Sequence, residues 1–146
     1  MTRPRILLMD DEIDIQEVMS ELLTLHGYDV VCVSNGEEAV QSYLEAMHSH
    51  NPYAAVVLDL TIDNGMGGRD AILKLQEVDP DVLGVVSSGF ANEPAMVDFK
   101  QHGFSARMEK PYRVAKLDET LRSLISSCAL FPLIVKMNPT TPRECF

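Results

Sequence analysis

Short apolar runs alternate along the chain with segments in which apolar residues recur at helical spacing. The apolar runs cover residues 6–9, 28–33, 54–58, 83–87 and 105–108, a length typical of buried strands. Helical stripes cover residues 15–23, 40–47, 71–75 and 114–128, and Pro94 can open a shorter helix that runs to about His102. The alternation predicts a succession of five βα units.

Residues at the ends of the helical segments support this interpretation. Gly27 and Gly103 follow the first and fourth segments, where glycine commonly ends a helix. Asn35, with Glu38 three residues later, has the pattern of a helix start. Short βα connections favour a parallel sheet covered by helices on both faces. We therefore expect an α/β fold of the flavodoxin-like doubly wound type, with a five-stranded parallel sheet in the strand order 2-1-3-4-5.

Carboxylates follow two of the predicted strands. Asp10 and Asp11 come directly after the first strand, and Asp59 ends the third. In this strand order the two strands are neighbours at the switch point of the sheet, where open α/β sheets bind ligands. Like charges brought together there repel one another unless a cation neutralises them. Mg²⁺, which prefers carboxylate and phosphate oxygens, is the expected cation.

Two further polar residues fall on the same edge of the predicted sheet. Ser88 follows the fourth strand, and Lys110 follows the fifth strand and precedes Pro111. Each of these residues alone would more often be structural. A carboxylate nucleophile, a cation site, a hydroxyl and an ammonium group are together the components that phosphoryl transfer requires. The set in this order therefore indicates a phosphoryl-transfer site.

Charge and cysteine content exclude several classes of protein. The net charge of -10 and the pI of about 4.7 leave no basic surface for nucleic acid, so no direct contact with nucleic acid is expected. The three cysteines are Cys32, Cys128 and Cys145, whose spacing fits neither a disulfide framework nor a zinc site. No apolar run approaches the length of a membrane span, so no direct membrane contact is expected. These features predict a cytoplasmic protein.

With these residues in place, the chain resembles the receiver domain of two-component response regulators over roughly residues 5–127. The resemblance rests on an acidic pair after the first strand, a lone aspartate after the third, a serine after the fourth and Lys-Pro after the fifth. It implies that Asp59 is the phosphoacceptor and that Asp11 binds Mg²⁺ directly. Asp10 would hold a metal-bound water, and the backbone carbonyl of Thr61 would complete the protein ligands.

The resemblance also assigns the other two polar residues. Ser88 would form a hydrogen bond with one phosphoryl oxygen of the modified aspartate, and Lys110 would form an ion pair with another. Ser88 is chosen over Ser87 because the family places a small residue directly after this hydroxyl, and Gly89 follows Ser88. The peptide bond between the lysine and Pro111 is usually cis in this family.

Three further positions bear on switching and on the lifetime of the phosphoryl group. Many receivers carry Tyr or Phe three residues before the lysine, a ring that turns inward on phosphorylation, whereas this chain has Arg107 there. The aromatic switch is therefore in doubt, and Arg107 either contacts a partner or an acidic neighbour or lies on the solvated surface. Thr61 and Phe90 lie two residues past Asp59 and Ser88, where they flank the approach of water.

The resemblance implies partners as well as a site. A receiver accepts its phosphoryl group from the phosphohistidine of a histidine kinase or of a histidine phosphotransfer domain, and it then switches conformation. It catalyses its own modification and slow dephosphorylation, and it turns over no other product. Residues 59–62, 65–68, 87–90 and 110–113 look most like the C-terminal receivers of hybrid sensor histidine kinases. A free-standing receiver and a piece of such a kinase are both compatible with the sequence.

The end of the chain falls outside the repeat of strands and helices. We expect the receiver domain to occupy residues 1–128 and a C-terminal tail to occupy residues 129–146. The apolar run 130–135 suits packing on the domain or on a second copy, so a homodimer is a hypothesis. Residues 138–142 have the composition of a disordered segment.

Two other classes of protein share part of this pattern. An aspartyl-phosphate phosphatase of the haloacid-dehalogenase type would use Asp10 as nucleophile, with a second acid two residues later. Glu12 is a poor substitute for that aspartate, and the chain is too short for a cap domain. A flavodoxin-like FMN carrier would place its phosphate loop after the first strand, where carboxylates repel a phosphate. We therefore favour the receiver over both alternatives.

Overall fold

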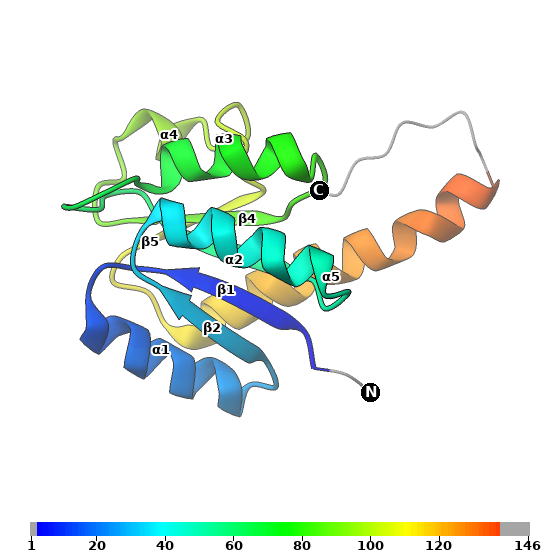
Figure 1. Cartoon of the computed structure of the whole chain (residues 1–146), viewed down its shortest axis with the longest axis horizontal. Coiled ribbons are helices and arrows are strands. Elements are labelled where there is room, and N and C mark those ends of the chain that lie inside the picture. The colour runs from blue at the N-terminus through cyan, green and yellow to red at the C-terminus, as the bar shows by residue number, and fades with distance from the viewer. Residues whose placement is uncertain (1–2, 138–146) are drawn as a thin grey trace.

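The computed structural model describes the backbone of residues 3–137 and the side chains as far as residue 127 (Figure 1). Strands and helices alternate along this part of the chain. In chain order they are β1 (Arg5–Met9), α1 (Ile13–Leu25), β2 (Asp29–Val33), α2 (Gly36–His48), β3 (Ala55–Asp59), α3 (Gly68–Val78), β4 (Gly84–Ser88), α4 (Pro94–Val97), β5 (Ala106–Glu109) and α5 (Val114–Met137).

The strands form one parallel sheet in the order β2-β1-β3-β4-β5, which confirms the predicted topology. Helices α2, α3 and α4 cover one face of the sheet, and α1 and α5 cover the other (Figure 1). Each face has its own apolar core, in which successive residues of a strand contribute alternately. Strands β3 and β4 are buried along their whole length, as expected for central strands covered on both faces.

The register of the sheet brings the predicted site residues to one edge. Met9 at the end of β1 pairs with Leu58, so Asp10 and Asp59 are the next residues along neighbouring strands. Asp59 pairs in turn with Ser87 of β4, and Ser88 pairs with Glu109 of β5. The carboxyl ends of four strands therefore meet where the polar residues follow them.

Helix starts and stops follow the signals in the sequence. Asn35 is the N-cap of α2, and its side chain accepts a hydrogen bond from Glu38 N at 2.9 Å. The Glu38 carboxylate accepts one from Ser34 N at 2.9 Å, which completes a box-like cap. Gly27 and Gly103 both have left-handed φ angles, of 101° and 95°, which glycine adopts at no steric cost.

Two helices differ from the prediction. Helix α4 ends at Val97 instead of near His102, and hydrogen-bonded turns fill the chain from there to Gly103. Val97 and Asp98 are both weak helix formers, and Asp98 N closes the helix on the carbonyl of Pro94. Helix α5 continues past residue 128 to Met137, and its C-terminal part extends away from the sheet (Figure 1).

Strands β4 and β5 each lie one residue later than predicted. The part of the predicted tail from 138 to 146 lies outside the described residues. Within residues 3–137, no helix combines the length and apolar character needed to cross a membrane.

Candidate functional site

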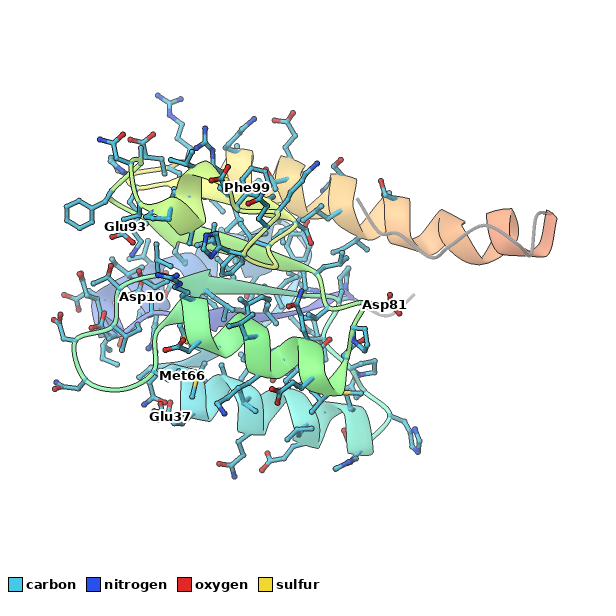
Figure 2. All side chains as sticks on the ribbon, turned by 90° about the horizontal axis from the view of Figure 1, so that it is seen from above. Asp10, Glu37, Met66, Asp81, Glu93 and Phe99 are labelled. Atoms are coloured by element: carbon cyan, nitrogen blue, oxygen red, sulfur yellow. The ribbon has the colours of Figure 1, made fainter. Side chains whose placement is uncertain are left out.

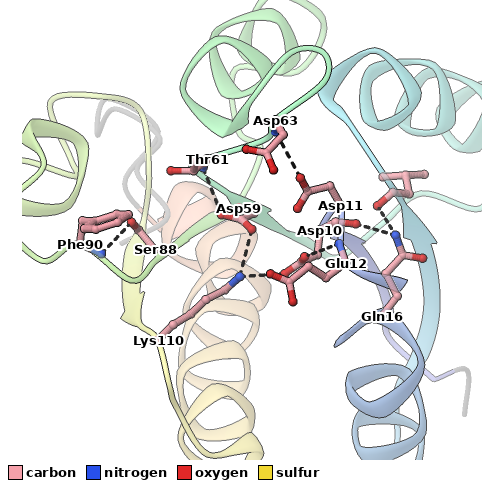
Figure 3. Close-up of polar contacts among 11 residues, drawn as sticks. Asp10, Asp11, Glu12, Gln16, Asp59, Thr61, Asp63, Ser88, Phe90 and Lys110 are labelled. Carbon is pink, nitrogen blue, oxygen red and sulfur yellow. Dashed lines mark hydrogen bonds and ion pairs between the residues drawn. The ribbon is translucent and has the colours of Figure 1, made fainter. Parts of the chain in front are cut away.

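The ammonium group of Lys110 joins two of the predicted site carboxylates (Figure 3). Lys110 Nζ lies 2.8 Å from Asp10 Oδ2 and 3.0 Å from Asp59 Oδ2. The side chains of Asp10 and Asp59 are only 4% and 9% exposed, so these ion pairs are poorly screened by solvent. Burial alone would lower the pKa of Lys110, but the hydrogen bonds to both carboxylates outweigh it and raise that pKa above its ordinary value.

Asp59 is held at the end of β3 by contacts to both of its carboxylate oxygens. Its Oδ1 accepts a hydrogen bond from Thr61 N at 3.1 Å, while its Oδ2 faces Lys110. Burial raises the pKa of Asp59, and the hydrogen bond and charge of Lys110 offset that rise only in part. Both oxygens of this poorly hydrated carboxylate are therefore anchored, which is the arrangement that a nucleophilic role would require.

Asp10 and Asp11 leave β1 in different environments. Asp10 is buried, and its Oδ1 accepts a hydrogen bond from Glu12 N at 2.9 Å. Asp11 is partly exposed, and its Oδ2 accepts one from Asp63 N at 3.2 Å, in the loop after β3. The Asp10 carboxylate therefore lies in the interior of the site, and the Asp11 carboxylate lies at its solvent-facing rim.

The arrangement of carboxylates fits a hard divalent cation. One oxygen from each of Asp10, Asp11 and Asp59 lies within 4.8 Å of the others. Three carboxylates against one lysine leave an excess of negative charge, to which Glu12 and Asp63 on the same cleft add, and Mg²⁺ would offset part of it. Asp11, Asp59, Thr61 and Lys110 also line a common cleft of about 220 Å³.

Ser88 ends β4 on the same edge and is buried. Its hydroxyl accepts a hydrogen bond from Phe90 N at 3.0 Å, within the loop that follows the strand (Figure 3). Ser87 is also buried, and alternation along the strand turns its side chain to the opposite face. Phe90 is 64% exposed and lines the same cleft as Asp59.

The glycine-rich loop after β3 passes close to Asp59. A Cβ atom on Gly67 would lie 2.7 Å from the Leu60 carbonyl oxygen, and one on Gly68 would lie 2.8 Å from that of Asp59. The loop is also tied to α2, because the Glu37 carboxylate accepts a hydrogen bond from Met66 N at 3.0 Å (Figure 2). Glycine is therefore needed here for close backbone approach.

Arg107 replaces the aromatic residue of many receivers and contacts the backbone of a neighbouring helix. It is exposed on β5, and its Nη1 donates a hydrogen bond to the carbonyl oxygen of Met96 at 3.1 Å. The acceptor is in α4, a helix of four residues. This contact with a helix carbonyl was not among the alternatives weighed from the sequence. The Lys110–Pro111 peptide bond, which follows β5, is cis, as the resemblance predicts.

Two residues that bind Asp10 or Asp11 were not predicted from the sequence. Gln16 lies three residues before Met19 and seven before Leu23, all on the buried face of α1. A polar residue within such a stripe was a usable signal. Asp63 lies in an irregular loop, where no periodicity indicates its contact with Asp11.

An open parallel sheet that brings three carboxylates and a lysine together at its switch point, with a serine at the end of the next strand, is the arrangement expected of an aspartate phosphoacceptor domain. Residues 6–122 match the family model of the response regulator receiver domain, and the chain belongs to this family. It is therefore a receiver domain of two-component signalling, and this assignment excludes the phosphatase and FMN-carrier interpretations.

Relatives and solved structures agree with this assignment. The chain is 26% identical over 121 residues to the chemotaxis protein CheY of Thermotoga maritima, covering 82% of this chain and 96% of that protein. It is 28% identical to the transcriptional regulatory protein PrrA of Mycobacterium tuberculosis over 86% of this chain, but it spans only 51% of that longer relative.

The structure superposes on the magnesium-bound receiver domain of the sensor histidine kinase PA1611 from Pseudomonas aeruginosa PAO1 with a TM-score of 0.74. That likeness has 24% identity and covers 87% of this chain and 100% of the other. A sensor protein from Polaromonas sp. JS666 gives a TM-score of 0.73 at 28% identity, covering 85% of this chain and 97% of the other.

Proposed function

We propose that Asp59 accepts the phosphoryl group of a partner's phosphohistidine. The observation that carries this proposal is the anchoring of both Asp59 carboxylate oxygens, by Lys110 Nζ at 3.0 Å and by Thr61 N at 3.1 Å, beside an open cleft. An Asp59 oxygen attacks phosphorus, the phosphorus–nitrogen bond breaks, and the neutral imidazole leaves after taking up a proton. The product is an acyl phosphate on Asp59.

The chain's own residues would gather around the added charge. Lys110 already contacts Asp59, so its ammonium group can follow a phosphoryl oxygen on the same side chain with little movement. The Ser88 hydroxyl, at the end of the next strand, would donate a hydrogen bond to a second oxygen. To do so it needs no change in its bond with Phe90 N, because it accepts there and keeps its proton.

Asp10, Asp11, Asp59 and the carbonyl of Thr61 are the residues that would hold Mg²⁺. Asp11 would bind it directly and Asp10 through water, since Asp10 is already engaged by Lys110 and Glu12 N. The ion would neutralise part of the negative charge that the Asp59 carboxylate and the incoming phosphoryl group bring together.

A small phosphodonor tests this proposal without any partner protein. Incubation with acetyl phosphate and Mg²⁺ should add one phosphoryl group, detectable by intact mass, and EDTA should prevent it. The Asp59→Asn variant should remain unlabelled, because an amide is a far weaker nucleophile than a carboxylate. Equal labelling of the variant and the wild type would remove Asp59 from this role.

The signal is proposed to leave the site through α4 and β5. Lys110 directly follows β5, and Arg107 on that strand donates to the Met96 carbonyl of α4. A change in the position of Lys110 can therefore alter the contact between strand and helix without an aromatic switch.

The phosphodonor is proposed to be a histidine kinase or a histidine phosphotransfer domain in the cytoplasm. Family membership supports the class of partner, and the composition supports the compartment. Two observations support an origin within a hybrid sensor kinase. Residues 59–62, 65–68, 87–90 and 110–113 resemble the receivers of such kinases, and the structure is similar to that of a sensor protein at 28% identity. Sequencing the gene on both sides of the segment that encodes this chain tests that origin, because a hybrid kinase gene would also encode a kinase domain.

We propose further that the receiver is complete by residue 128 and that residues 129–146 serve contact between two copies. The apolar run 130–135 supports this division. A chain without residues 129–146 should sediment as a monomer at concentrations where the full chain is a dimer. Identical sedimentation of both chains would contradict the proposal.

A further inference from the structure

We propose that Gln16 positions the metal-binding carboxylate of Asp11 by fixing the peptide that joins Asp10 to Asp11. Gln16 lies on the buried face of α1 and is 9% exposed. Its side-chain amide reaches the loop that carries both aspartates (Figure 3). The inference rests on the proposed magnesium site and adds to it a residue that touches neither metal nor phosphate.

The contacts of Gln16 converge on the carboxyl ends of two strands. Its Nε2 donates to the carbonyl oxygen of Asp10 at 2.5 Å and lies 3.2 Å from both the carbonyl oxygen of Val33 and the hydroxyl of Ser34. The Asp10 amide donates to the same Val33 carbonyl at 3.1 Å. One side chain therefore ties the first residue after β1 to the last residue of β2.

The Asp10 carbonyl belongs to the peptide plane that links Asp10 to Asp11. A peptide is planar, so fixing this oxygen also fixes the direction in which the chain enters Asp11. The Asp10 side chain has separate anchors in Glu12 N and Lys110 Nζ. Asp11 is partly exposed, and its carboxylate is held by an amide in an irregular loop. Its orientation therefore depends strongly on the peptide plane.

A purely structural role for Gln16 would be to satisfy the carbonyl groups at the strand ends. Buried carbonyls do require partners, and Gln16 provides them. A positioning role differs because it predicts that loss of the amide weakens cation binding beyond any loss of stability. Groups that orient metal ligands typically change metal affinity by about 10- to 100-fold when removed.

The chain offers a matched control in Gln76 of α3. Its Nε2 donates to the Gly103 carbonyl at 3.3 Å, so it is a half-buried helical glutamine that also binds a loop carbonyl, but it lies away from the carboxylates. Methionine replaces glutamine with little change of length and without a donor. Gln16→Met and Gln76→Met therefore remove the same type of contact at two places.

The experiment measures Mg²⁺ binding by titration calorimetry on the full chain, with no phosphodonor present. Gln16→Met should raise the Mg²⁺ dissociation constant about tenfold or more, whereas Gln76→Met should leave it within about twofold of wild type. Circular dichroism at the same temperature establishes that each variant is folded. If Gln16→Met fails to fold, Gln16→Asn, which keeps the amide but is too short, takes its place with the same expectation.

Unchanged Mg²⁺ affinity in the folded Gln16 variant would overturn the positioning role and leave the proposed site intact. An equal loss in the Gln76 variant would also overturn it, because the effect would then reflect general loosening. A wild-type chain that binds no Mg²⁺ would instead refute the proposed metal site itself.

Discussion

At the scale of single residues, the charge balance of the site depends on how Asp59 and Lys110 share a buried environment. Lys110 contacts Asp59 at 3.0 Å and Asp10 at 2.8 Å, so one cation serves two carboxylates. The pKa of Asp59 is nevertheless raised, because burial disfavours its charge more than the shared lysine favours it. Ionised Asp59 therefore destabilises the unmodified fold, as is common for functional groups.

The variant Asp59→Asn should for this reason be more stable than wild type at neutral pH without divalent cations. A carboxyl whose pKa is higher in the folded than in the unfolded state stabilises the fold when protonated, and this contribution disappears as the pH rises through the folded pKa. The difference between variant and wild type should therefore shrink as the pH falls toward the ordinary value of 3.8. Urea unfolding of both proteins over this range measures it. A variant that is less stable at neutral pH would contradict the argument.

At the scale of elements, the loop between β3 and α3 depends on glycine for its path beneath Asp59. Gly68 begins α3 and approaches the carbonyl of Asp59, the residue that ends β3. The strand end that carries the nucleophile and the first turn of the next helix are thereby packed backbone to backbone. Any side chain at Gly68 would have to displace one of them.

Gly68→Ala should destabilise the protein and move Asp59. Its Cβ would lie 2.8 Å from the Asp59 carbonyl oxygen, and overpacking of this kind costs about 1–3 kcal/mol. The gain from alanine in a helix is at most about 1 kcal/mol, so the loss should prevail.

The control for this prediction is Gly89→Ala, in the loop after β4. A Cβ at Gly89 meets nothing within 4 Å, so the free energy of unfolding should stay within about 0.5 kcal/mol of wild type. Urea denaturation compares the two variants directly. Equal stability of both would show that the loop can shift to accommodate the methyl group.

At the scale of the whole molecule, the strands and helices that follow a periodic apolar pattern could be predicted from the sequence. Helix ends and side-chain contacts that depend on tertiary packing could not. The five βα units follow from the apolar runs and helical stripes, and the meeting of Asp10 with Asp59 follows from the flavodoxin-like strand order that such units favour. The early end of α4 follows weak helix formers at Val97 and Asp98 that the apolar pattern does not reveal, and no pattern along β5 indicates the contact of Arg107 with the Met96 carbonyl. Gln16 was missed because its helical stripe was interpreted from apolar residues alone.

The net charge of -10 makes cation effects a property of the whole molecule as well as of the site. Any salt screens the repulsion among surface carboxylates and should raise the melting temperature somewhat. Mg²⁺ should raise it further, because an ion that binds only the folded state adds about 2.7 kcal/mol of stability at 100 times its dissociation constant. Sodium chloride at the same ionic strength isolates the contribution of screening.

The variant Asp11→Asn separates the site from the rest of the surface. It removes one of the three carboxylates that lie within 4.8 Å of one another, while the net charge of the whole chain changes by only one unit. In thermal unfolding, the increment that Mg²⁺ gives over sodium chloride should largely vanish in this variant, and the response to sodium chloride should persist. An undiminished Mg²⁺ increment would place the stabilising ion elsewhere on the acidic surface, because the Asp11 carboxylate would then contribute nothing to its binding.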